Sequence, residues 1–267
     1  MSFFKKLFGK KEKPKEQLPK KEQSEAEWEE EIQRMMEALA PHKRTAYRPQ
    51  VEKTSRSFSP DGKIGGYPYL RHENDWPICP SCQKHMQLFL QLNLTDLPER
   101  EGTGLVQLFY CTNSEPLCES DLQAFFPFSK AVVCRKVTID GESAQIEPKR
   151  ADVFAEQRIV GWKAVDDYPH YEEHQELGIE EFEDEVYDLM DEREIGIPVQ
   201  GDKLFGWPYL VQSAEYPYDR ESGSRMELLF QFDSEDNLPY MFGDAGIGHL
   251  TQSPDNEQEL GFGWACS

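Results

Sequence analysis

The sequence lacks long hydrophobic runs, and no apolar stretch approaches the roughly 20 residues that a membrane-spanning helix needs. Lysines interrupt the first apolar residues, which lie between Phe3 and Phe8, so no secretory signal peptide is expected. These absences predict a soluble, cytoplasmic protein. In that compartment the six cysteines are expected to be reduced thiols rather than disulfides.

Basic residues are scarce outside the N-terminus. The chain has 50 acidic and 29 basic residues and a formal net charge of −21. Residues 1–22 contain eight lysines and three glutamates, a local charge of +5, so the rest of the chain carries −26. Such a body repels a phosphate backbone, which argues against nucleic-acid binding. It suits either a basic protein partner or solubility alone.

Familiar catalytic motifs are also missing: the sequence has no P-loop, G-x-S-x-G, H-E-x-x-H or dinucleotide-binding fingerprint. Asp244, His249 and Cys266 are the nearest approach to an acid, imidazole and thiol set. The surrounding G-D-A-G-I-G-H-L is also explained by turns, with Asp244 bonding to backbone amides. His170 and His174 stand four residues apart, but Pro169 and the nearby acids favour a solvated loop over a metal site.

What is present indicates a folded, β-rich chain behind a basic tail. Hydrophobic residues make up 38% and aromatic residues 12%, enough for a core, and 18 prolines with 18 glycines indicate many turns. Residues 1–23 predict a disordered basic tail because residues 9–23 are mostly lysine, glutamate and proline. Within the tail, residues 1–11 have an amphipathic pattern that suits weak peripheral contact with an anionic membrane.

Two helices are predicted. The first begins at Ser24, which forms a capping box with Glu27, and ends at Pro41. The second lies within residues 166–194, which hold 14 acidic residues and one arginine. Its apolar residues have helical spacing and include Ile179, Phe182, Val186, Leu189 and Met190. The sequence thus predicts an acidic connecting helix, whose outer face is either solvated or a docking strip for a basic protein.

The most informative pattern is an internal repeat at an offset of 140 residues. Residues 63–70 (KIGGYPYL) match residues 203–210 (KLFGWPYL), and residues 86–92 (MQLFLQL) match residues 226–232 (MELLFQF). Short β-type runs accompany it at residues 86–94, 104–110, 131–139, 226–232 and 248–251. Gln91 and Gln231 fall at equivalent places and are expected to bond to backbone near the turns. The predicted fold is α+β and β-rich: an internally duplicated pair of antiparallel β units with an N-terminal helix and an acidic connecting helix.

Four of the six cysteines cluster in the first repeat. Cys79 and Cys82 form a C-x2-C knuckle, and Cys111 and Cys118 form a C-x6-C pair. Two such pairs on neighbouring elements can supply the four thiolates of a tetrahedral structural zinc site. His85 can replace one cysteine as a ligand, and a redox pair or simple reduced thiols remain as alternatives. At the same offset the second repeat has Asp219 and Ser222, so the fold itself does not require cysteine there.

These motifs together resemble the YwqG-like bacterial proteins of unknown function. The resemblance rests on Gly65, Gly66 and Pro68, on Gln91, Asn93, Leu97 and Pro98, on Gly104, Gln107, Phe109 and Tyr110, and on Gly243, Asp244, Ala245 and Gly246. The cysteine arrangement is similar to that of programmed cell death protein two and its relatives. The resemblance implies one domain over residues 24–267, made of two repeats at about 58–140 and about 195–267.

The resemblance also bears on function. The eukaryotic group is associated with chaperoning a ribosomal protein, and the bacterial group with toxin and immunity genes. Both imply a non-enzymatic module that binds a basic protein, as a chaperone or as an immunity-type partner. The alternative is a hydrolase or redox enzyme that uses Asp244, His249 and Cys266, or the Cys79 and Cys82 pair.

Overall fold

The computed structural model describes residues 24–150, 152–212 and 216–266. The predicted tail, with its candidate membrane-contact segment 1–11, lies outside the described residues. No helix among the described residues has the length and hydropathy needed to cross a membrane.

The helices are α1 (Glu25–Leu39), α2 (Cys118–Asp121), α3 (His174–Leu177) and α4 (Asp184–Glu192), with short 3-10 turns η1 (Ala40–His42), η2 (Glu73–Asp75), η3 (Leu94–Asp96) and η4 (Tyr171–Glu173).

The described strands form one ten-stranded antiparallel sheet in the order β10-β9-β8-β7-β1-β6-β2-β3-β4-β5. In chain order they are β1 (Arg44–Lys53), β2 (Lys63–Ile64), β3 (Gln87–Asn93), β4 (Leu105–Tyr110), β5 (Val132–Val137), β6 (Gln157–Asp167), β7 (Lys203–Leu204), β8 (Glu227–Asp233), β9 (Ile247–Gln252) and β10 (Leu260–Ala265). The sheet curls until it nearly closes, and the amide of Trp264 in β10 donates to the carbonyl of Phe125, in the loop before β5.

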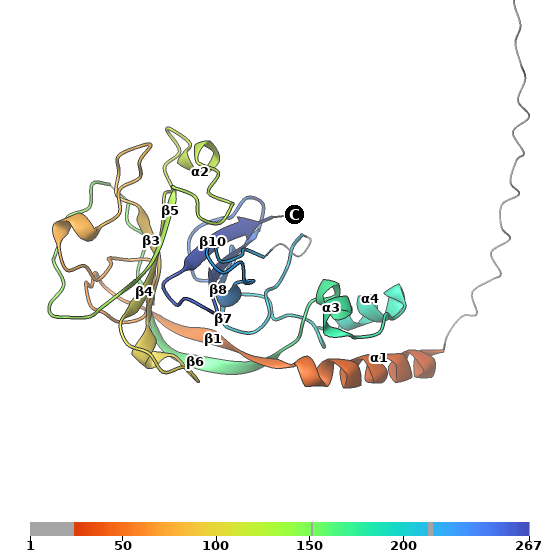
Figure 1. The fold of residues 1–267 in the computed structure, drawn as a ribbon. Coiled ribbons are helices and arrows are strands. Elements are labelled where there is room, and N and C mark those ends of the chain that lie inside the picture. The colour runs from red at the N-terminus through yellow and green to blue at the C-terminus, as the bar shows by residue number, and fades with distance from the viewer. Residues whose placement is uncertain (1–23, 151, 213–215, 267) are drawn as a thin grey trace, which may run out of the picture.

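The long pair β1 and β6 joins the two halves of the sheet along the base of the molecule (Figure 1). Strand β6 pairs with β2 of the first half, and β1 pairs with β7 of the second half. Because β1 and β6 also pair with each other, they connect the two halves into one sheet. The sequence analysis missed both strands because exposed and charged side chains are spread along them, and because Pro49 interrupts β1. Tertiary pairing overrides these weak local signals.

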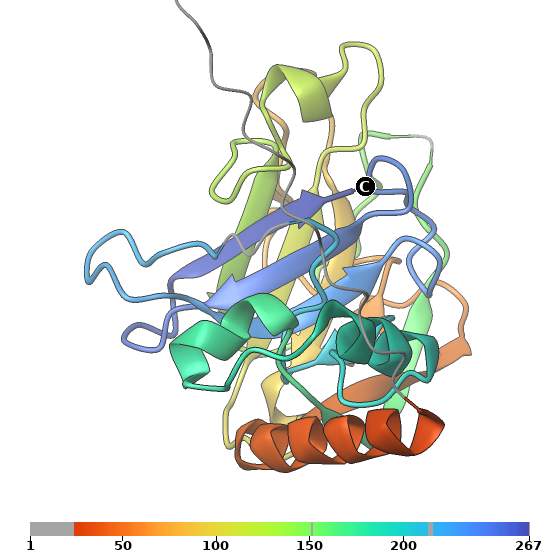
Figure 2. The same cartoon turned by 90° about the vertical axis from the view of Figure 1, so that its right-hand side faces the viewer.

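One aromatic core lies between the two halves, whose strands cross one another in Figure 2. Phe89 of β3 contacts Phe232 of β8, with ring centroids 6.4 Å apart, and Tyr110 of β4 contacts Phe262 of β10 at 5.9 Å. The strands expected at residues 86–94, 104–110, 131–139, 226–232 and 248–251 are all present within a few residues. The halves therefore bury their apolar faces against each other.

The two predicted helices have different outcomes. Helix α1 is confirmed, with the Ser24 and Glu27 capping box in place. The acidic helix was predicted from Ile179, but α4 begins only at Asp184. Gly178 ends α3 in a left-handed conformation, and the chain stays extended at Glu183, which delays the helix. Ile179 and Phe182 still pack with α1 and α4 in a second, smaller core cluster.

Candidate metal centre

Cys79 and Cys82 lie on a tight turn that precedes β3. Ile78 and His85 form a β-bridge across it. Within the turn the amide of Cys79 donates to the carbonyl of Lys84 at 2.9 Å, and the amide of Gln83 donates to the carbonyl of Cys79 at 3.0 Å. These bonds set both thiols on one side of a short loop.

The second pair comes from the chain that follows β4. Cys111 is the first residue after that strand, and its amide donates to the carbonyl of Ala131 at 2.9 Å. Cys118 is the first residue of α2, and its amide donates to the carbonyl of Asn113 at 3.1 Å. The side chain of Lys84 reaches Asn113 Oδ1 at 2.6 Å and ties this loop to the first turn.

The four sulfur atoms converge. The Sγ atoms of Cys79, Cys82, Cys111 and Cys118 all lie within 4.8 Å of one another, and those of Cys82 and Cys111 are 3.7 Å apart. Four thiolates about 2.3 Å from a central zinc ion would stand about 3.8 Å from each other in a regular tetrahedron. The cluster can hold a metal ion, and this donor set and spacing fit zinc.

The surroundings favour a bound cation. Cys79, Cys111 and Cys118 are buried, and Cys82 is partly buried. Burial raises the pKa of Cys111 and of Cys118. Burial opposes ionisation of Cys79 as well, but the amides of Cys82 and Ser81, together with the side chains of Cys111 and Cys118, outweigh it and lower the pKa of this thiol. Ionisation of Cys79 is thus favoured by its surroundings, whereas ionisation of Cys111 and Cys118 would need a positive ion to offset burial.

The second half has the same turn without the cysteines. Tyr218 and Arg225 form the bridge, and the amide of Asp219 donates to the carbonyl of Ser224 at 2.9 Å. The Asp219 carboxylate accepts from the amides of Glu221 and Ser222 at 2.7 and 2.9 Å, as the Cys79 thiolate does from Ser81 and Cys82. A carboxylate that bonds its own turn explains how this half keeps the loop without a metal ion.

His85 is not part of the cluster. Its Nδ1 accepts from the amide of Lys149 at 3.0 Å, and its ring stacks on Trp76 with centroids 5.0 Å apart. Cys134 and Cys266 also lie outside the group of converging sulfurs. All six cysteines are free thiols in the structure.

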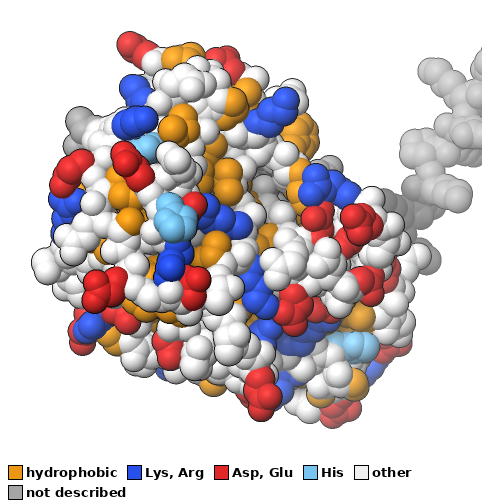
Figure 3. Space-filling model, turned by 60° about the vertical axis from the view of Figure 1, so that its left-hand side comes forward, with side chains coloured by type: hydrophobic (Ala, Val, Ile, Leu, Met, Phe, Trp, Pro, Cys, Tyr) orange, Lys and Arg blue, Asp and Glu red, His pale blue; other side chains and the backbone are white. Residues whose placement is uncertain are grey.

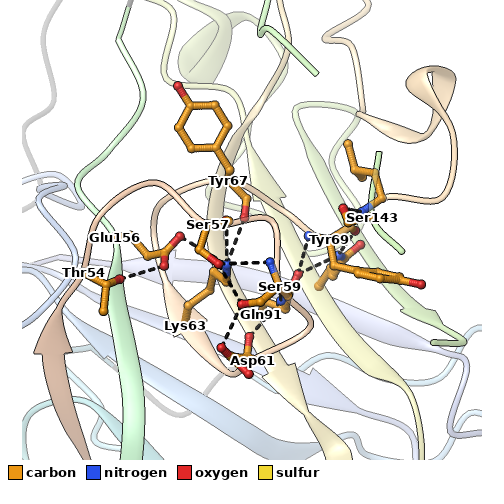
Figure 4. A network of polar contacts seen from close by, with 12 residues as sticks. Thr54, Ser57, Ser59, Asp61, Lys63, Tyr67, Tyr69, Gln91, Ser143 and Glu156 are labelled. Carbon is orange, nitrogen blue, oxygen red and sulfur yellow. Dashed lines mark hydrogen bonds and ion pairs between the residues drawn. The ribbon is translucent and has the colours of Figure 1, made fainter. Parts of the chain in front are cut away.

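The predicted backbone role of the two glutamines is confirmed. Gln91 Oε1 accepts from the amide of Tyr69 at 2.9 Å, and its Nε2 donates to the carbonyls of Ser59 and Asp61 (Figure 4). Gln231 accepts from the amide of Tyr209 at 2.7 Å and donates to the carbonyls of Val199 and Gly201. These bonds fix the G-x-P turns against the sheet.

Sequence reasoning missed two buried ion pairs that stand beside these glutamines. Lys63 Nζ lies 3.2 Å from Glu156 Oε2 and Lys203 Nζ lies 2.8 Å from Asp167 Oδ2, and both lysines are 0% exposed. Lys63 also donates to the carbonyls of Ser57 and Tyr67 (Figure 4). The repeat contained a signal, because KIGGYPYL and KLFGWPYL both begin with lysine. Because Lys63 and Lys203 occupy equivalent buried positions in the sheet, opposite Gln91 and Gln231, the repeated lysine has a structural role.

The alternative catalytic residues are only partly brought together. His249 and Cys266 line one apolar groove of about 620 Å³ beside β9 and β10, and Asp244 is not among its lining residues. His249 Nε2 bonds to the carbonyl of Tyr209 at 3.1 Å, and no hydrogen bond joins it to Cys266 among the described contacts. The expectation of a solvated loop for His170 and His174 is wrong for His174, which is buried in α3 with its ring 5.8 Å from that of Tyr187 in α4.

Taken together, fold and site define an α+β protein with one curled antiparallel sheet and a four-cysteine cluster on one half. The chain belongs to the family described as a domain of unknown function (DUF1963), whose model matches residues 62–263. No curated protein matches the chain. The matched range covers the cysteine cluster and strands β2 to β9 and leaves out α1 and β1.

Proposed function

We propose that the chain is a non-enzymatic binding module that carries a structural zinc ion and recognises a basic protein. The observation that carries the zinc assignment is the convergence of four sulfur atoms within 4.8 Å of one another. Four protein ligands complete a tetrahedron and leave no open position for a substrate, which is typical of structural rather than catalytic zinc. Bound zinc would link the turn at Cys79 to α2 at Cys118.

We further infer that the two halves arose by duplication, as in the YwqG-like proteins that the sequence resembles. The strand order supports this, because each half contributes a short strand followed by three longer strands running to a sheet edge. Lys63 pairs with Gln91 and Lys203 with Gln231, and the next register irregularities fall at Leu88/Leu90 and at Leu228/Phe230. In this proposal one copy kept or gained the zinc ligands, as in programmed cell death protein two and its relatives.

A basic partner is supported by charge. Residues 23–267 carry a net charge of −26, and a surface of one sign steers a partner of the opposite sign. On the face seen in Figure 3, acidic and basic side chains are interspersed. Because an acidic body repels a phosphate backbone, we propose a protein partner rather than a nucleic acid. We also propose a cytoplasmic location.

Metal analysis of the full chain, purified without chelators, tests the zinc assignment. We expect about one zinc ion per chain, and Cys82→Ser should lower the zinc content and loosen the first half. Structural zinc is worth about 10 kcal/mol or more in apparent free energy. A metal-to-protein ratio near zero in the wild-type chain would overturn this part of the proposal.

A pull-down at low salt tests the binding function. We expect a specific basic protein to co-purify and to be released as the ionic strength rises, because salt screens charge attraction. Recovery of no specific protein at low salt would contradict the proposal. Turnover lost on Cys266→Ala would favour the enzyme alternative instead.

A further inference from the structure

A cavity of about 250 Å³ lies between the acidic helices and the second half of the sheet. Figures 1 and 2 show α3 and α4 packed above α1, and these three helices supply part of its wall, while the loops around them supply the rest. Aromatic and imidazole side chains, apolar side chains and two carboxylates line it, including His170, Tyr171, His174, Tyr187, Asp188 and Asp191. The cavity is separate from the cysteine cluster, with which it shares no residue.

His174 is the first sign that the cavity takes a ligand. Its side chain is only 5% exposed, and neither ring nitrogen makes a hydrogen bond of normal geometry to a described residue, although the backbone of Pro169 is close enough to act against burial on the pKa of the ring. Buried polar groups in folded proteins normally have a partner. Burial lowers the pKa of His174 and of His170, so both rings are neutral near pH 7 and do not repel a cation. A neutral imidazole always has one nitrogen that accepts a hydrogen bond.

Aromatic rings form the second feature. The ring of Tyr187 lies 5.9 Å from that of Tyr171 and 5.8 Å from that of His174, measured between centroids. The ring of His170 lies 4.1 Å from that of Tyr171. Four rings, from α3, α4, the turn η4 and the residue before that turn, thus form a connected group. Groups of aromatic faces of this kind bind ammonium groups through their negative π surfaces.

Charge at the mouth is the third feature. Asp188 and Asp191 line the cavity, and both residues are exposed. Among the described residues neither of them forms an ion pair, whereas Glu180 on the same segment is paired with Arg34. Two unpaired carboxylates beside aromatic walls favour a cation over a neutral or anionic ligand.

We propose that this cavity binds an alkylammonium group, namely the side chain of a lysine on the basic partner, and this inference rests on the proposed function. The methylene stem would lie along Met35, Ile197 and Leu210 on the apolar wall. The ammonium group would meet the rings and donate a hydrogen bond to His174. Its charge would be balanced by Asp188 and Asp191 at the mouth.

The cavity itself is tested with n-butylammonium chloride on the full chain, followed by NMR of the His174 and Tyr187 side chains. We expect saturable shifts in the millimolar range, which corresponds to about −4 kcal/mol or weaker. The matched neutral probe, 1-pentanol, should leave these resonances unchanged at equal concentration. Absence of saturable shifts with the ammonium probe would overturn the inference.

Variants connect the cavity to the partner. With a synthetic peptide of eight lysines, Asp191→Asn and Tyr187→Leu should each weaken binding about 3- to 10-fold, whereas Tyr187→Phe should keep it because the ring face remains. Glu101→Gln removes the same charge from an exposed residue outside the cavity and serves as the matched control.

The outcomes separate this inference from the proposed function. A basic partner retained equally by wild type, Asp191→Asn and Tyr187→Leu would overturn the cavity as its site and leave the proposed function intact. Saturable n-butylammonium binding with no basic partner recovered would overturn the proposed function and leave the cation site.

Discussion

His249 Nε2 lies 3.1 Å from the carbonyl oxygen of Tyr209, and in the other half Gln107 Nε2 donates to the carbonyl of Tyr69 at 2.7 Å. A carbonyl oxygen only accepts, so Nε2 of His249 carries the proton in the neutral ring. Register supports the comparison, because Gln107 faces Gln91 and His249 faces Gln231. His249 therefore has the place and the bond of a structural glutamine.

This relationship predicts an acid-sensitive stability. Burial, with a smaller effect of Lys203, lowers the pKa of His249 to about 4, whereas an unfolded histidine has a pKa of about 6.5. The unfolded chain binds a proton at His249 more tightly than the folded chain does. The contribution of the neutral imidazole to the free energy of unfolding is therefore complete above pH 6.5. It is lost as the pH falls towards 4, by at most about 3 kcal/mol.

His249→Gln should remove that sensitivity, since glutamine donates the same bond and does not titrate. We expect urea unfolding midpoints at pH 7.5 and pH 4.5 to lie closer together in His249→Gln than in wild type. The exposed His72 provides the control variant His72→Gln, which should behave as wild type. An unchanged pH dependence in His249→Gln would contradict this assignment.

The metal proposal predicts a local effect of chelation. In that proposal a zinc ion would join Cys118 to the first turn, so its removal should free the start of α2. Hydrogen exchange should then speed up at Asp121 and Leu122, whose amides donate to the carbonyls of Leu117 and Cys118. The turn at Asp219–Gly223 is the internal control, because a carboxylate rather than a metal holds it. Equal acceleration in both turns would point to general unfolding instead.

A cysteine comparison tests ligand identity. Cys118→Ser should lower the zinc content strongly, because a neutral hydroxyl is a poor zinc ligand beside three thiolates. Cys134→Ser is the matched control, because Cys134 lies in β5 outside the sulfur cluster. Equal zinc content in the two variants would exclude Cys118 as a ligand.

The buried pair of Lys203 and Asp167 should be costly to break. Asp167 Oδ2 accepts from Lys203 Nζ and from the amide of Trp207, both at 2.8 Å. Lys203→Met leaves a buried carboxylate without its counter-ion, and we expect a loss of about 3–5 kcal/mol in urea unfolding. The double variant Lys203→Met/Asp167→Asn should lose less, because it removes the unpaired charge. A larger loss in the double variant would contradict this explanation.

Gln91 should matter more than its neighbour Gln87. Gln91→Leu removes the partner of the Tyr69 amide, of two carbonyls and of Gln107 Nε2, so we expect a loss of at least about 3 kcal/mol. Gln87 makes two such bonds, to the backbone of Asp152 and Phe154, and Gln87→Leu should cost about half as much. Thermal unfolding of both variants measures the difference, and equal losses would contradict it.

Local patterns were sufficient for several elements. The capping box predicted α1 because Ser24 and Glu27 satisfy amides within one turn. Short β-type runs between turn residues predicted β3, β4, β5, β8 and β9. The 140-residue repeat predicted the shared backbone role of Gln91 and Gln231. Spacing predicted which four cysteines meet, since both pairs border strands that are adjacent in the sheet.

Other features depend on contacts between residues far apart in the chain. Strands β1 and β6 have weak local signals and exist because each pairs with the other along its length. The late start of α4, the burial of His174 and the pairing of Lys203 with Asp167 also depend on which elements pack together. The sequence by itself determined the turns, the repeat and the thiol donors, because these follow from chemistry within a few residues. Only the tertiary structure decided the long central strands, the buried charges and the aromatic cavity, because burial is a property of the assembled sheet and helices.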